Sequence, residues 1–145
     1  MAEASKEIRE FFDAYAKATR SLDLAFLESA YGDTFMFASA GGVQAVKRDD
    51  FLKVVPKRGA FFRAAGLVGS EVSRLEEMGL DEKHTLIQTH WSLRFEKDRG
   101  RPIIEEIAAT YVLRRQPGSW QIVFQLDHQD LTKRVQELGL LPPSG

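Results

Sequence analysis

Residues 84–127 read HTLIQTHWSLRFEKDRGRPIIEEIAATYVLRRQPGSWQIVFQLD, and this stretch decides the fold. Three runs rich in β-branched and aromatic residues span 84–97, 102–115 and 120–127. Turn-forming residues separate them at 97–101 and at 116–119. We therefore predict an antiparallel three-stranded meander, with its first hairpin centred on Arg99 and its second on Pro117-Gly118.

Side-chain alternation divides the predicted meander into two faces. The expected cross-strand pairs are Trp91 with Ile107, Ile107 with His128, Tyr111 with Phe124, and Leu113 with Ile122. In that register one face is almost continuously apolar, from Ile87 to Leu126. An apolar face of this size has to be covered by other parts of the chain, and the preceding segments are predicted to be helical.

Apolar residues recur at helical spacing in three earlier segments and in one later segment. The predicted helices span 5–20, a short stretch from Ser21 or Asp23 to Gly32, about 48–66, and 130–139. Pro56 is expected to break or kink the third helix. Shorter strands are predicted at 34–40, 43–46 and 67–77. This order indicates the α+β class, in a single domain over residues 1–145 whose tail after about residue 140 is expected to be flexible.

The composition is that of a soluble globular domain. The 145 residues include no cysteine, which removes disulfides, thiolate nucleophiles and sulfur-ligated metals. Three scattered histidines lack the spacing of a metal site. No motif predicts a cofactor.

Charge gives little indication of a macromolecular partner. The formal net charge is −1, which offers no general attraction to nucleic acid or to an anionic membrane. The longest basic feature, formed by Lys53, Lys57, Arg58 and Arg63, is interpreted as a solvated helix face rather than as an anion site. The charged N-terminus lacks an apolar secretion core, so a cytoplasmic protein is predicted.

Three stretches of the chain carry a family resemblance. They are residues 111–123 (YVLRRQPGSWQIV), residues 33–37 (DTFMF) followed by Gly41-Gly42, and residues 47–52 (KRDDFL). They resemble the nuclear transport factor 2-like superfamily, also called cystatin-like α+β, and within it the SnoaL-like branch. The first stretch is the most specific, because it is similar to that branch's glycine turn followed by tryptophan-x-isoleucine-valine. The resemblance covers nearly the whole chain.

The resemblance implies a curved, mostly antiparallel sheet wrapped around N-terminal helices in a cone, with a conical cavity and a homodimer formed through the sheet. Members of the superfamily include cyclases, isomerases, dehydratases, epoxide hydrolases, transport factors and association domains, so the fold does not specify the function. This chain departs from many SnoaL-like relatives, which have histidines where it has Phe124 and Leu126. Its Phe35 to Phe37 segment has no clear counterpart of the aspartate-rich pockets of isomerases and epoxide hydrolases.

Few polar residues lie on the predicted concave face, and these are the candidates for a site. Glu105 and His128 are the candidate catalytic pair, because an apolar cavity raises the pKa of a carboxyl group and a nearby imidazole can transfer protons. The simpler alternative is a solvated Glu105 and a His128 that packs where its strand ends. The residues predicted to line the ligand pocket are Tyr15, Trp91, Glu105, Tyr111, Phe124 and His128. Packing in an aromatic core is the alternative for Tyr15, Trp91 and Tyr111.

The opposite face of the predicted sheet mixes polar and aliphatic side chains. We interpret it as the partly buried interface of a homodimer, with an open, solvated face as the alternative. The residues predicted at this interface are Gln88, His90, Ser92, Glu106, Thr110 and Gln125.

These observations leave three functions open. The first is binding of a small, largely apolar ligand in the conical pocket without catalysis, since carboxylates are scarce there. The second is a cofactor-free cyclase, isomerase or dehydratase that uses acid–base residues in that pocket. The third is a module for dimerisation or interaction, which a core without a cavity would favour.

Overall fold

The computed structural model describes residues 1–97 and 100–141. The helices are α1 (Lys6–Ser21), α2 (Leu24–Ala30), α3 (Arg48–Ala64) and α4 (Leu131–Glu137). The strands are β1 (Ala2–Glu3), β2 (Tyr31–Ser39), β3 (Gly42–Lys47), β4 (Leu67–Gly79), β5 (His84–Phe95), β6 (Ile103–Gln116) and β7 (Ser119–Asp127). The predicted hairpin centre at Arg99 and residues 142–145 of the predicted flexible tail lie outside the described residues.

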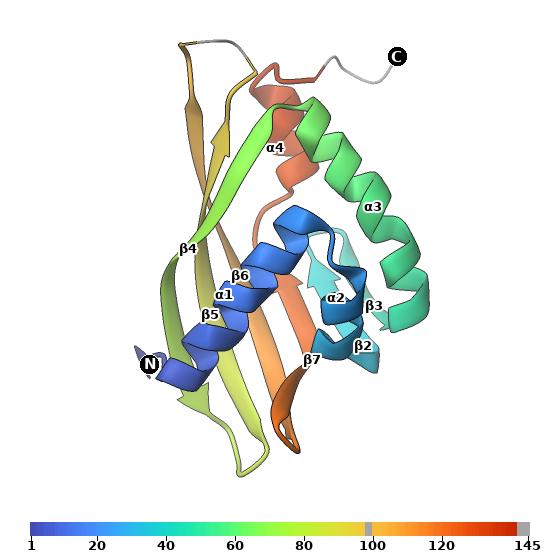
Figure 1. The fold of residues 1–145 in the computed structure, drawn as a ribbon, viewed down its shortest axis with the longest axis vertical. Helices are drawn as coiled ribbons and strands as arrows, with labels where there is room; N and C mark the ends of the chain where they lie inside the picture. The colour runs from blue at the N-terminus through green and yellow to red at the C-terminus, as the bar shows by residue number, and fades with distance from the viewer. Residues whose placement is uncertain (98–99, 142–145) are drawn as a thin grey trace.

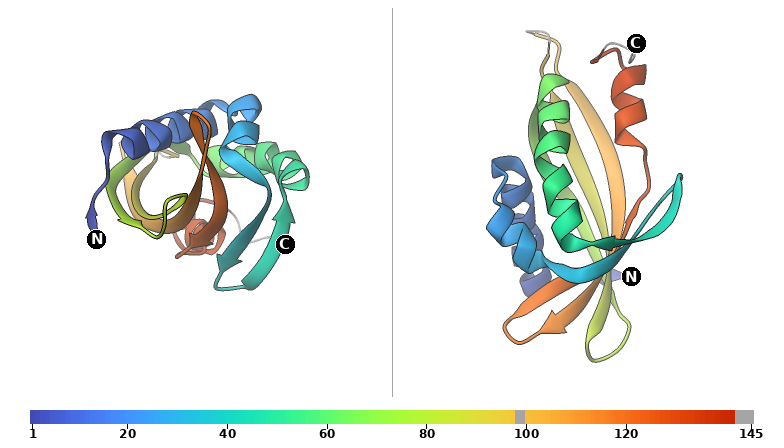
Figure 2. Two further views of the ribbon diagram at one scale, coloured as in Figure 1. Left: turned by 90° about the horizontal axis from the view of Figure 1, so that it is seen from below. Right: turned by 90° about the vertical axis from the view of Figure 1, so that its right-hand side faces the viewer.

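The strands form one curved sheet in the order β1-β4-β5-β6-β7-β2-β3. All neighbours are antiparallel except β2 and β7, which run parallel. The sheet curls around α1, which crosses its concave face, while α3 lies along the open side (Figures 1 and 2). This arrangement confirms the predicted α+β fold with a curved, mostly antiparallel sheet.

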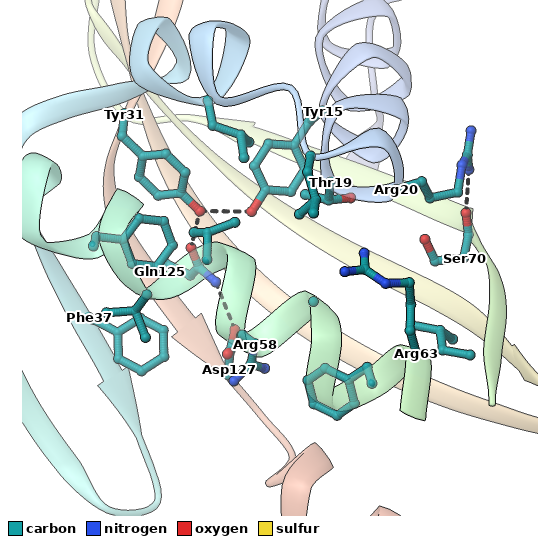
Figure 3. A pocket seen from close by; sticks show the side chains of 18 of the residues that line it. Tyr15, Thr19, Arg20, Tyr31, Phe37, Arg58, Arg63, Ser70, Gln125 and Asp127 are labelled. Carbon is teal, nitrogen blue, oxygen red and sulfur yellow. Dashed lines mark hydrogen bonds between the residues drawn. The ribbon is translucent and has the colours of Figure 1, made fainter. Parts of the chain in front are cut away.

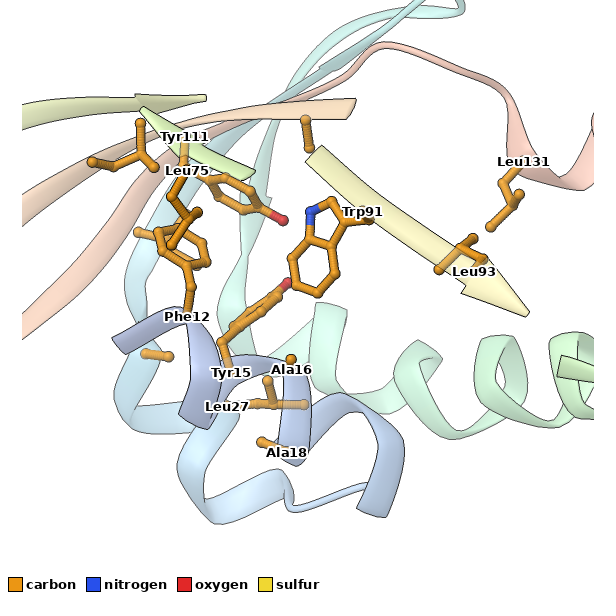
Figure 4. Packing of buried hydrophobic residues seen from close by; sticks show 14 of the residues in the cluster. Phe12, Tyr15, Ala16, Ala18, Leu27, Leu75, Trp91, Leu93, Tyr111 and Leu131 are labelled. Carbon is orange, nitrogen blue, oxygen red and sulfur yellow. The ribbon is translucent and has the colours of Figure 1, made fainter. Parts of the chain in front are cut away.

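The concave face of the sheet and α1 form the core. Ser5 caps α1, because its Oγ accepts a hydrogen bond from the Ile8 N–H at 3.4 Å. Phe12 and Tyr15 point from α1 toward the sheet (Figure 4). The ring centroids of Phe12 and Tyr111 are 5.2 Å apart, and those of Tyr15 and Trp91 are 6.1 Å apart. These aromatic contacts attach α1 to the middle of the sheet.

The third helix, α3, is attached much more loosely. Only Phe62 of its 17 residues is buried, and Val54 is 56% exposed. Pro56 lies inside the helix without ending it, so of the predicted break or kink the break is wrong and the kink stays a prediction. A proline removes one backbone hydrogen bond, and the turns on both sides continue here. No helix within residues 1–97 and 100–141 combines the length and the apolar character needed to cross a membrane.

The first predicted hairpin register is correct, and the second is correct only near its turn. Trp91 pairs with Ile107 on β5 and β6. Leu113 pairs with Ile122 on β6 and β7, also as predicted. The register then shifts by one residue, because Val123 forms a bulge.

The bulge reverses the faces predicted for the end of β7. Tyr111 pairs with Gln125 instead of Phe124. Since neighbouring side chains of a strand point to opposite faces, Gln125 and Asp127 turn to the concave side, and Phe124 and His128 turn to the outer side. The predicted placement of these four residues is therefore wrong.

Candidate functional site

A cavity of about 700 Å³ lies between α3 and the concave side of the sheet. It is bounded by the C-terminal half of α1, by α2, by the β2–β3 hairpin and by parts of β4 and β7 (Figure 3). Its apolar lining includes Leu27, Phe37, Phe51, Val55 and Phe62. The loose attachment of α3 thus leaves space beneath the helix, which a tightly packed helix would fill.

A chain of hydrogen bonds crosses the inner wall of this cavity. The Tyr15 and Tyr31 hydroxyl oxygens are 2.7 Å apart. The Tyr31 hydroxyl donates to Gln125 Oε1 at 2.7 Å, and Gln125 Nε2 donates to Asp127 Oδ1 at 3.0 Å. These four residues come from α1, β2 and β7, so the chain joins parts of the sequence that are far apart (Figure 3).

The order of the protons follows from the last member of the chain. Asp127, as a carboxylate, only accepts, so Gln125 turns its NH₂ group to Asp127 and its carbonyl oxygen to Tyr31. A hydroxyl has one proton, and Tyr31 gives its proton to Gln125. Tyr15 must therefore donate to Tyr31. Both hydroxyl protons are committed within the protein, and Asp127 is left with acceptor capacity facing the cavity.

Burial raises the pKa of Tyr15, Tyr31 and Tyr111 above the usual 10.0. The rise is smaller for Tyr15, because the neighbouring Tyr31 and Tyr111 hydroxyl groups stabilise its phenolate. For Tyr31 and Tyr111 the pKa is raised well above 10.0, since burial and the charge of a neighbouring Tyr15 phenolate act together. All three hydroxyls therefore stay protonated at neutral pH.

The structure separates the residues predicted to share one pocket. Tyr15 lines the cavity. Trp91 and Tyr111 belong to the aromatic core beside it, where Trp91 Nε1 donates to Thr89 Oγ1 at 2.8 Å. Phe124 lies on the outer face, because of the bulge in β7.

Glu105 and His128 do not face a common cavity. Glu105 forms an ion pair with Arg134 of α4, at the end of the sheet near the C-terminus. His128 is exposed on the outer face, where its Nε2 lies 2.7 Å from Thr110 Oγ1. The register shift separates them, since a straight β7 would have turned His128 to the concave side. The predicted acid–base pair is not assembled.

Five of the six residues predicted at a dimer interface share the outer face of the sheet. Gln88 pairs with Thr110, and Ser92 pairs with Glu106. His90 lies between them on β5, and its Nε2 is 3.7 Å from Glu76 Oε1. The sixth, Gln125, is buried on the concave side. Assembly through this face stays a prediction.

Sequence reasoning missed Tyr31, Gln125 and Asp127. Tyr31 follows the last residue of α2 and begins β2, at a position predicted to be helical. Alternation without the bulge places Gln125 and Asp127 on the opposite face. Their spacing of two residues indicates that both side chains lie on the same face of the strand, but it does not indicate which face. Within the described part of the chain, no group of three His, Asp or Glu side chains is arranged to hold a metal ion.

The curved sheet wrapped around helices defines a class of α+β domain, and comparison with solved structures shows the same fold. Aln2 from a Streptomyces species is 16% identical and has a TM-score of 0.70, over 91% of this chain and 98% of that one. An NTF2-like protein with a cystatin-like fold from Novosphingobium aromaticivorans is 15% identical, with a TM-score of 0.69, over 90% and 86%.

An NTF2-like protein of unknown function from Shewanella oneidensis MR-1 is 17% identical, with a TM-score of 0.67, over 85% of this chain and 97% of that one. The model of the family described as NTF2-like protein (DUF6841) matches residues 5–130. The chain therefore belongs to this NTF2-like family, as the sequence resemblance indicated. Its placement in the SnoaL-like branch stays a prediction. No curated protein sequence matches the chain.

Proposed function

We propose that this protein binds a small, largely apolar molecule in the cavity beneath α3. The observation that carries the proposal is the size and lining of the cavity. A volume of about 700 Å³ lies within the usual range for ligand sites, about 300–1,000 Å³. Protein interiors rarely leave such a space beside a complete core. An apolar lining with a few fixed polar groups is also typical of ligand sites.

Filling the cavity is expected to weaken binding. The reporter is N-phenyl-1-naphthylamine, an uncharged aromatic dye whose fluorescence rises in apolar surroundings. Val55→Trp places an indole in the cavity from α3, so the affinity for the dye should fall about tenfold or more. Fluorescence titration measures the effect.

Val43→Trp is the matched control for this experiment. Val43 is 65% exposed on the edge strand β3 and does not line the cavity, so this variant should bind the dye as the wild type does. Far-ultraviolet circular dichroism checks that both variants keep the fold. Absence of saturable binding by the wild type, or equal binding by a folded Val55→Trp variant, would contradict the proposal.

Acid–base catalysis is the second candidate function, and it now has a different basis. Asp127 lines the cavity and only one of its oxygens accepts a hydrogen bond from a described residue. It is the inner carboxylate that could take the role predicted for Glu105. The hydroxyl protons of Tyr15 and Tyr31 already form hydrogen bonds within the protein, so these hydroxyls are poor donors to a substrate carbonyl. Catalysis is therefore less well supported than binding alone.

A further inference from the structure

Two arginines of α3 line the cavity. Arg58 and Arg63 are both exposed and both contribute to its wall. Lys53 and Lys57, the other members of the basic cluster, do not line it. The sequence indicates one solvated basic face, but the structure divides it. The two arginines line the cavity and the two lysines do not.

Arg58 is held against the cavity wall. Its guanidinium carbon lies 5.0 Å from the ring centroid of Phe62, which is buried. A guanidinium over an aromatic face is attracted by the ring, so this contact orients the side chain. The charge of Arg58 also reaches the interior, because it opposes the rise in the pKa of Tyr15 and Tyr111.

Arg63 extends from α3 toward the middle of the cavity (Figure 3). Its Nη1 lies beside Gly59, which also lines the cavity, and would be 3.5 Å from a Cβ built there. Arg63 and Gly59 thus line the same part of the cavity wall. Arg58 and Arg63 therefore present their charges to the same space.

These two charges are not neutralised by the carboxylates around them. Neither arginine forms an ion pair with any carboxylate among the described residues. Three arginines line the cavity, Arg20, Arg58 and Arg63, against two carboxylates, Asp50 and Asp127. Asp50 Oδ1 is also 4.0 Å from Lys53 Nζ. The lining of the cavity therefore has an excess of positive charge, and each guanidinium group has a forked geometry that matches a carboxylate.

We propose that the ligand is an amphipathic anion, with its apolar body in the cavity and its carboxylate at Arg58 and Arg63. This inference rests on the proposed ligand-binding function and specifies the chemistry of the ligand. The inner wall agrees with it, since Tyr15 and Tyr31 have no proton left for a polar group at that end. The ligand's charged group is therefore expected at the arginine end.

Two dyes with the same aromatic body test the proposal. They are 8-anilino-1-naphthalenesulfonate, which carries one negative charge, and the uncharged N-phenyl-1-naphthylamine. The wild type should bind the anionic dye more tightly. Arg58→Gln and Arg63→Gln should each weaken anionic-dye binding about three- to tenfold and change binding of the uncharged dye by less than about twofold.

Lys57→Gln is the matched control, because it removes the same charge from α3 away from the cavity, and it should leave both affinities unchanged. Salt provides a test that needs no variant. Added NaCl should weaken binding of the anionic dye and leave binding of the uncharged dye unchanged. Decanoate should displace that dye more strongly than decanol does.

The outcomes separate the two proposals. If the uncharged dye binds in the cavity but the arginine variants and salt affect both dyes equally, the anion proposal is overturned and the proposed function stands. If neither dye binds the wild type, the proposed function itself fails. A preference for the anionic dye that the Arg58→Gln/Arg63→Gln double variant keeps would also overturn the anion proposal.

Discussion

Raising the pH above 10 is expected to destabilise this protein steeply. The chain has three tyrosines, all of them buried around the hydrogen-bond chain at the cavity. Burial raises the pKa of each above the unfolded value of 10.0. Each neutral hydroxyl therefore contributes a stabilisation that is complete below pH 10.

The sign follows from proton release. Above pH 10 the unfolded chain loses tyrosine protons that the folded chain keeps, so the free energy of unfolding falls as the pH rises toward the folded-state pKa values. Each tyrosine contributes a slope of about 1.4 kcal/mol per pH unit, and all three together about 4 kcal/mol per pH unit. Urea unfolding at a series of alkaline pH values measures this slope.

Tyr111→Phe is the internal control for the alkaline experiment, because it removes one titrating group and should reduce the slope by about a third. Tyrosinate absorbance should rise together with the loss of structure. Tyrosinate that forms near pH 10 in a chain that stays folded would contradict the buried arrangement.

Gly66→Ala is expected to be the most damaging single substitution around the cavity. Gly66 connects α3 to β4 with a φ of +97°, in the left-handed region that favours glycine. A Cβ there would lie 2.7 Å from the Lys97 backbone nitrogen and 2.9 Å from its Cα. Because backbone atoms cannot move aside easily, the strain and the clash together should lower the free energy of unfolding by about 3 kcal/mol or more.

Gly79→Ala is the matched control for this substitution. Gly79 ends β4, needs no positive φ and has no atom within 4 Å of the position that an alanine methyl group would take. This variant should change the free energy of unfolding by less than about 1 kcal/mol. Urea denaturation of both variants measures the difference, and similar stabilities would contradict the account of Gly66.

Local signals predicted most of the fold. Ser5 caps α1, and the Pro117-Gly118 turn sets Gln116 opposite Ser119. The first hairpin register is also correct, since β5 pairs with β6 without a shift over its whole length. Caps, turns and alternation are properties of neighbouring residues, so the sequence specifies them directly.

The candidate site was misplaced because a bulge left no local signal. Ile122, Val123 and Phe124 are three consecutive apolar residues, so the sequence does not show which of their side chains point to the concave face. An extra residue inserted there moves no polar side chain of this run to the wrong face. The following Gln125 and Asp127 alternate equally well in either register. In the folded chain, the parallel pairing of β2 with β7 brings the buried Tyr31 hydroxyl to Gln125, and their hydrogen bond stabilises Gln125 on the concave side.

The charge of the cavity could not be predicted for a similar reason. Arg58 and Arg63 lie on a helix with one buried residue, so periodicity alone assigns them to solvent. Their convergence depends on the position of α3 over the curved sheet, which is set by tertiary contacts. The contact between Arg58 and Phe62 is different, because it joins residues four apart on α3 and therefore follows from helical spacing.

The most direct test of the cavity as a binding site is a contact map of the bound dye. Isotope-filtered nuclear Overhauser spectra of the protein with N-phenyl-1-naphthylamine should show contacts from the dye to the methyl groups of Leu27 and Val55, which line the cavity. Contacts confined to Leu86 and Val112, which pair on the outer face of the sheet, would contradict the account.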